Sequence, residues 1–188
     1  AQIGQPPRYL RWEENDREHR DLPKRRHYKF YFRSVLEQQP ELPILLDVVE
    51  EGRSYHHITK LPIKTVFIKP EREIQVPLPT LESLLGDKLT AFAPKTIGVP
   101  LYKSPSEPGE LMQVAKQLFD VGSLFDVVQD FQQVAETYAK THALENEYRG
   151  GHYSFDAALQ DTYDASMALT AINTKVMGSF PDAPRLYR

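Results

Sequence analysis

The hydrophobic pattern of this 188-residue chain changes its period at Thr80, and this change limits the folds open to it. Before Thr80, apolar residues alternate with polar ones or form short runs, as in β-strands. After Thr80 they recur every three or four residues, as in amphipathic helices. The order therefore predicts an α+β fold, with a small, mostly antiparallel sheet in residues 1–79 and a helical bundle in residues 80–188.

Four segments before Thr80 have strand character. They are residues 27–36, 42–51, 61–68 and 72–79. The second segment is apolar on both faces, which predicts a central strand, and Pro77 is expected to end the fourth. The charged segment near the N-terminus is predicted to lie on the surface, with a short helix around Glu13–His19.

The helices are predicted from their apolar spacing and their end signals. Their ranges are residues 81–92, 114–128, 128–148 and 155–178, with a long Pro-rich loop at 94–110. Thr80 and Ser154 are expected N-caps, and the pair Gly150–Gly151 is expected to break the third helix from the fourth.

Lys88 is the first unusual residue, because it lies inside the apolar arc of the helix "LESLLGDKLTAF". At about 100° per residue, Lys88 falls at about 340° from Leu81, between Leu84 at about 300° and Phe92 at about 20°. A lysine in such a position needs a partner or must bring its ammonium group to water. Two interpretations remain open: a snorkelling side chain, or an ammonium group that reaches a carboxylate or phosphate in a cleft.

Asp47 is the second unusual residue, because it interrupts the apolar run "ILLDVV". A carboxylate in a buried strand is costly unless it is paired, hydrogen-bonded or bound to a cation. It is either an exposed aspartate at a sheet edge or a metal-binding or catalytic carboxylate at the sheet rim. Asp47 and Lys88 together form a candidate pair.

Lys116 and Asp120 in "KQLFD" are four residues apart, so they are expected to meet on one helix face. The same face carries Gln113 and Gln117, which predicts a solvated surface opposite the apolar stripe. The adjacent histidines His56 and His57 point to opposite faces of a strand, which disfavours a shared metal ion.

Composition excludes several classes of protein. The net charge of −3 disfavours general coating of nucleic acid, although "KRRHYK" offers a local basic stretch beside aromatics. There is no cysteine, and no apolar run approaches the roughly 20 residues that span a bilayer. These features predict a cytoplasmic protein without a membrane partner. The chain opens on Ala1 rather than methionine, and we expect it to be part of a longer protein.

The order "ILLDVV", "LPTLESLLGDKLTAF" and "KQLFDVGSLFD" resembles the AbiEii/AbiGii-type nucleotidyltransferases, which include toxins of abortive-infection toxin–antitoxin systems. The resemblance covers roughly residues 28–128. It implies a nucleotidyltransferase-like sheet, of which residues 1–79 form the end, followed by a helical domain. It also implies an NTP substrate, RNA as one acceptor, an antitoxin protein as partner, and magnesium.

By this resemblance, Asp47 matches a catalytic carboxylate that helps to bind magnesium, and Lys88 matches the lysine that meets the nucleotide phosphates. Lys116 and Asp120 match the ends of a Lys-Asp-x-x-Asp element and are expected at the nucleotide. Gln117 departs from that element, where the family has aspartate.

The family's Gly-Ser loop and paired carboxylates on one strand lie upstream of the matching region, and this chain does not supply them. We therefore expect the protein to be an enzyme only if those parts exist outside this chain. In that case the chain is a fragment or a truncated form of the complete protein. The alternative is a non-catalytic interaction module that docks a protein partner through its acidic helices.

Overall fold

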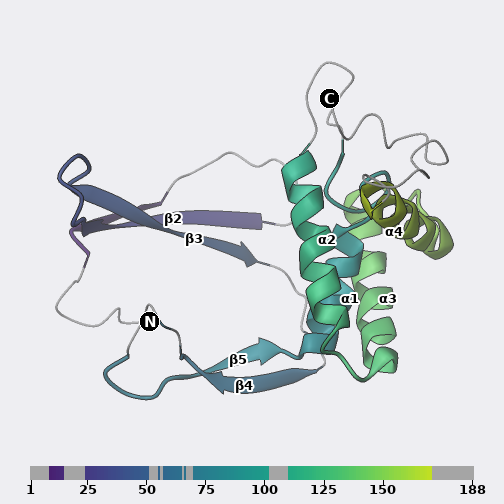
Figure 1. Ribbon diagram of the computed structural model, residues 1–188, viewed down its shortest axis with the longest axis horizontal. Coiled ribbons are helices and arrows are strands. Elements are labelled where there is room, and N and C mark those ends of the chain that lie inside the picture. The colour runs from purple at the N-terminus through teal and green to yellow at the C-terminus, as the bar shows by residue number, and fades with distance from the viewer. Residues whose placement is uncertain are drawn as a thin grey trace. The chain divides into compact units, whose positions relative to one another are not determined.

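The computed structural model describes residues 9–14, 24–50, 55, 57–64, 66, 70–101 and 110–170. The chain divides into two compact units, Ala1–Ser54 and Tyr55–Arg188. Sheet comes first and helices second, so the prediction of an α+β fold with small antiparallel sheets is confirmed (Figure 1). The finer prediction of a domain boundary at residue 79 stays a prediction.

The first unit contains one antiparallel sheet in the order β1-β2-β3. Its strands are β1 (Arg11–Glu14), β2 (Lys24–Arg33) and β3 (Glu41–Glu50). Trp12 pairs with Phe30, and Phe30 pairs with Ile44, so one face collects aromatic and aliphatic side chains. The other face is charged, and Tyr31 donates a 2.5 Å hydrogen bond to Glu13 there.

The first two residues of the helix expected around Glu13–His19 lie in β1, and its other residues lie outside the described part of the chain. The prediction of a central strand is wrong for the described sheet. Among the strands that the structure describes, β3 lies at one edge of its sheet, and Leu45 is 65% exposed, so the apolar run of β3 does not mark a central strand there. Apolar composition on both faces therefore did not indicate burial on both faces here.

The second unit contains a two-stranded antiparallel sheet and the helices. Its elements are β4 (Ile58–Pro62), β5 (Gln75–Pro79), α1 (Leu81–Ala91), α2 (Leu111–Phe125), α3 (Phe131–Tyr148) and α4 (Phe155–Thr170). The strands of residues 28–78 thus form two sheets rather than one. Pro77 lies inside β5 opposite Lys60 and does not end the strand.

The predicted helix boundaries hold at their capping residues. Thr80 caps α1 by accepting a hydrogen bond from the Ser83 backbone N–H at 3.2 Å, and Ser154 accepts one from Ala157 N–H at 3.2 Å. Gly150 and Gly151 follow α3 with φ values of 86° and 75°, which only glycine adopts readily. The predicted end of the last helix at Gly178 lies outside the described residues.

Helix α1 is the centre of the second unit, and α3 runs beside it (Figure 1). Its buried face carries small residues, which lets the two backbones approach closely. A Cβ atom on Gly86 would lie 2.7 Å from the Val134 carbonyl oxygen, 2.8 Å from Thr137 Cβ and 2.9 Å from Tyr138 N. The apolar core around this contact includes the fully buried side chains Leu85, Phe92, Ile97 and Val114.

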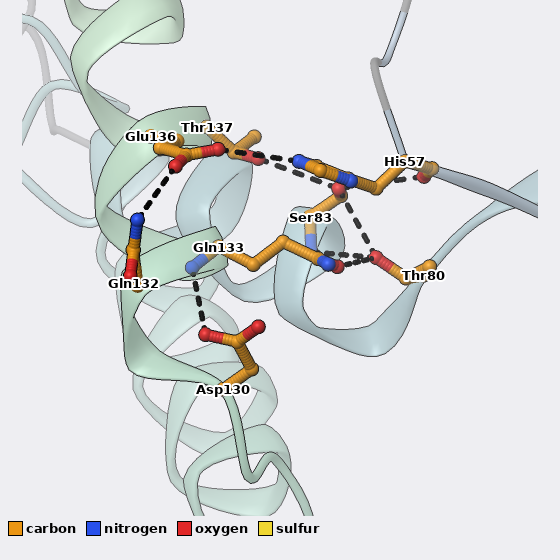
Figure 2. A network of polar contacts seen from close by, with 8 residues as sticks. All are labelled: His57, Thr80, Ser83, Asp130, Gln132, Gln133, Glu136 and Thr137. Carbon is orange, nitrogen blue, oxygen red and sulfur yellow. Dashed lines mark hydrogen bonds and ion pairs between the residues drawn. The ribbon is translucent and has the colours of Figure 1, made fainter.

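A polar network fixes the start of α1 against α3 (Figure 2). The Thr80 hydroxyl donates to the side-chain oxygen of Gln133, and the Thr137 hydroxyl donates to Ser83 Oγ at 3.3 Å. Ser83 is fully buried, so the bond from Thr137 gives a partner to a polar group that water does not reach. The network and the close approach at Gly86 set the orientation of α1 and thereby of Lys88.

The turn that follows α1 is held by a side chain of α4 and by the residue that follows α3. Asp161, only 5% exposed, accepts 2.8 Å hydrogen bonds from the Lys95 backbone N–H and the Thr96 hydroxyl. Arg149 donates to the carbonyl oxygens of Ile97 at 2.6 Å and Gly98 at 2.8 Å.

Among the described residues, no helix has the length and apolar character that crossing a bilayer requires.

Candidate functional site

Lys88 points from α1 toward α2, where its ammonium group meets two acceptors. Lys88 Nζ donates to Asp120 Oδ2 at 2.9 Å and to Gln117 Oε1 at 3.3 Å. The side chains of Lys88 and Asp120 are 25% and 24% exposed, so the contact lies at the rim of the core rather than inside it. Of the two interpretations drawn from the sequence, the structure shows the one in which the ammonium group reaches a carboxylate.

Lys116 completes the arrangement from the same helix as Asp120. Its Nζ donates to the same oxygen, Asp120 Oδ2, at 2.9 Å. The expected meeting of these two residues four positions apart is confirmed. Two ammonium groups therefore share one carboxylate oxygen, and the three charges together leave one net positive charge. We refer to Lys88, Gln117, Lys116 and Asp120 as the lysine cluster.

Hydrogen bonding sets the charge states in the lysine cluster. The hydrogen bonds that Asp120 accepts from Lys116 and then from Lys88 hold the pKa of that carboxyl below its usual value. The hydrogen bond to Asp120 likewise raises the pKa of Lys116. Asp120 therefore stays ionised and Lys116 stays cationic throughout the neutral range. A cation pair of this kind attracts phosphate oxygens, which carry negative charge and accept hydrogen bonds.

Gln117 is the member of the lysine cluster that sequence reasoning placed wrongly. The helical pattern of α2 predicts it on a solvated face, yet Gln117 is only 6% exposed. It is buried because α1 lies over this side of α2 and directs Lys88 at its amide oxygen. The burial of Gln117 could have been inferred from Lys88, because an inward lysine in α1 requires hydrogen-bond acceptors on the element against which α1 packs.

Asp47 lies in the first unit, so its proposed pairing with Lys88 stays a prediction. Within β3 its side chain is 69% exposed, and its Oδ1 atom lies 2.6 Å from Nδ1 of His27 on β2. Register explains this contact, since His27 and Asp47 are directly paired across the two strands. This pairing was not predicted from the sequence, because the sequence of the loop between β2 and β3 does not determine the register in which the two strands pair.

The residues around Asp47 do not by themselves fit a magnesium ion. Magnesium prefers a shell of oxygen ligands, usually with more than one carboxylate in a two-metal site. In the part of the chain that the structure describes, no three His, Cys, Asp or Glu side chains gather into a set that could hold a metal ion. Asp47 offers one carboxylate and shares it with an imidazole, so it supplies at most one ligand of such a shell.

The adjacent histidines of the sequence differ in what the structure describes of them. His57 Nε2 lies 3.3 Å from a carboxylate oxygen of Glu136 on α3, which ties the segment before β4 to that helix (Figure 2). Its neighbour His56 lies outside the described residues.

Replacing Asp120 with asparagine should lower the free energy of unfolding by about 1 kcal/mol at pH 7, because partial exposure keeps a rim ion pair modest. The pKa of the Asp120 carboxyl is lower in the folded protein than in the unfolded chain. The stabilisation that this carboxylate contributes is therefore complete above its pKa in the unfolded chain, and it is lost as the pH falls through its pKa in the folded protein. The difference between wild type and D120N should therefore shrink below about pH 4.

Urea unfolding of both proteins between pH 7 and pH 3 measures this effect. A difference that stays constant over the whole range would show that the Asp120 charge does not stabilise the fold.

Comparison with known proteins places the chain in a family. Residues 8–182 match the family described as "Nucleotidyl transferase AbiEii toxin, Type IV TA system". The match extends well beyond the segments at 28–128 that carry the resemblance in the sequence. No curated protein and no solved structure matches the chain. Because the match covers most of the chain, from β1 through α4, the protein belongs to the family of AbiEii nucleotidyl transferase toxins of type IV toxin–antitoxin systems.

Proposed function

We propose that the full-length protein transfers a nucleotidyl group from an NTP to an acceptor, with RNA as one acceptor, and that the lysine cluster binds the NTP phosphates. The observation that carries the proposal is the pair of 2.9 Å contacts from Lys88 and Lys116 to a single oxygen of Asp120. The carboxylate holds two cations in position but neutralises only one of them. The remaining positive charge favours an anionic ligand.

Each member of the lysine cluster has a separate role in this proposal. Lys88, fixed by the packing of α1, neutralises charge on the phosphates as the acceptor oxygen bonds to the α-phosphorus and pyrophosphate leaves. Lys116 is 55% exposed and is the cation that solvent and ligand reach more easily. Asp120 is a positioning residue, since it orients both ammonium groups rather than contacting the phosphates.

Asp47 has a more limited role in the proposal. Nucleotidyltransferases generally use a divalent metal, and magnesium is the ion expected here. We propose Asp47 as one ligand of that ion in the full-length protein, with its other ligands supplied from outside the described residues. The proposal thus treats this chain as part of a longer protein, because the family's Gly-Ser loop and paired carboxylates are not found among its matching segments. We also propose that the protein acts in the cytoplasm and that an antitoxin protein is its partner, as the role of the family implies.

Incubation of the full-length protein with labelled NTPs, Mg²⁺ and total RNA tests the proposed function. Label should pass to the RNA, and the transfer should disappear when Mg²⁺ is chelated. A protein that binds no NTP and labels no acceptor would favour a non-catalytic module that docks a protein partner.

A further inference from the structure

Phe119 is an exposed aromatic residue on α2 that the apolar core does not explain. It is 74% exposed, and Met112, two turns earlier on the same face, is 80% exposed. Single exposed apolar residues are common on protein surfaces. Here, however, Lys116 lies between the two, four residues after Met112 and three before Phe119, so a cation is flanked by apolar side chains along one helix face.

Phe119 is also the neighbour of one member of the lysine cluster along α2. Residues three apart on a helix have Cβ atoms about 5–6 Å from each other, so Phe119 and Lys116 are adjacent on the surface of α2. Lys116 in turn lies beside Lys88, because both donate to the same oxygen of Asp120. Phe119 and Lys116 thus occupy neighbouring positions on α2, and Lys116 shares its carboxylate partner with Lys88.

We propose that Phe119 stacks on the base of the nucleotide whose phosphates contact Lys88 and Lys116, an inference that rests on the proposed function. Every nucleobase has a π-face, and aromatic residues beside cations are the usual combination for binding a base together with its phosphates.

Calorimetric titration of the full-length protein with two probes tests the inference. The first probe is ATP with Mg²⁺, and the second is tripolyphosphate with Mg²⁺, which carries the phosphates without a base. Replacing Phe119 with alanine should weaken ATP binding about tenfold or more and leave tripolyphosphate binding unchanged. Phe119→Trp should retain ATP affinity because it keeps an aromatic face. Tyr163→Ala removes another exposed aromatic residue, from α4, and is the matched control.

The outcomes separate this inference from the function on which it rests. If wild-type protein binds neither probe, the proposed function fails and the inference fails with it. If wild type binds both probes and Phe119→Ala changes neither affinity, the phosphate site stands but the base lies elsewhere. Equal weakening of both probes by Phe119→Ala would also overturn the inference, since the ring would then support the lysine cluster rather than the base.

Discussion

Replacing Lys88 with alanine is expected to lower the rate of nucleotidyl transfer by the full-length protein about a hundredfold or more. Charge on the phosphate oxygens shifts as the α-phosphorus changes partners, and a fixed ammonium group stabilises that change without reorganising. Lys88 is well suited to this role because α1 is fixed by its packing against α3 and its ammonium group is already directed by Asp120. The steady-state rate of label transfer from NTP to acceptor measures the effect.

The same variant should remain folded, which distinguishes a functional role from a structural one. Asp120 keeps its hydrogen bond from Lys116 when Lys88 is lost, so no partly buried carboxylate is left without a cation. Lys140→Ala is the matched control, since Lys140 is an exposed lysine on the neighbouring helix α3. Folded Lys88→Ala protein with wild-type turnover would show that the phosphates do not meet this lysine.

Replacing Gly86 with alanine should destabilise the protein by about 2–3 kcal/mol, the cost of overpacking a close helix contact. The added Cβ atom would lie 2.7 Å from the Val134 carbonyl oxygen and 2.9 Å from Tyr138 N, both backbone atoms that cannot rotate away. The clash should outweigh the helix propensity that alanine gains over glycine, about 1 kcal/mol. Thermal or urea unfolding of the chain measures the difference.

Gly122→Ala is the matched control for that change, because it makes the same substitution inside α2 where a Cβ atom would meet nothing within 4 Å. This variant should be more stable than wild type by about 0.5–1 kcal/mol. If both variants are stabilised, α1 and α3 do not approach as closely as the structure places them. The orientation assigned to Lys88 would then lose its support.

Local signals predicted the helical unit well. The cap at Thr80, the pair Lys116–Asp120 and the break at Gly150 each depend on residues within one or two turns, and all three are present in the structure. The need of Lys88 for a partner was also predictable from its place in the apolar arc. The identity of that partner was not, since it depends on how two helices pack across a gap of about thirty residues.

The sheets were harder to predict because strand pairing depends on distant parts of the chain. Nothing local in "RWEE" indicates the strand β1. The pairing of β1 with β2 places Arg11 Cζ 3.5 Å from the centroid of the Tyr31 ring. Asp47 had two interpretations, an exposed aspartate at a sheet edge or a metal-binding carboxylate at the rim, and neither indicated that the register pairs it with His27. Register and edge position are properties of the assembled sheet, and a single strand sequence does not determine them.

A crystal structure of the full-length protein with a non-hydrolysable NTP analogue and Mg²⁺ would show whether the lysine cluster binds the phosphates. We predict a phosphate oxygen within hydrogen-bond distance, about 2.7–3.2 Å, of Lys88 Nζ, with Lys116 beside the same phosphate group. Phosphates bound elsewhere, with both lysines still engaged only by Asp120, would contradict the proposed role of the cluster.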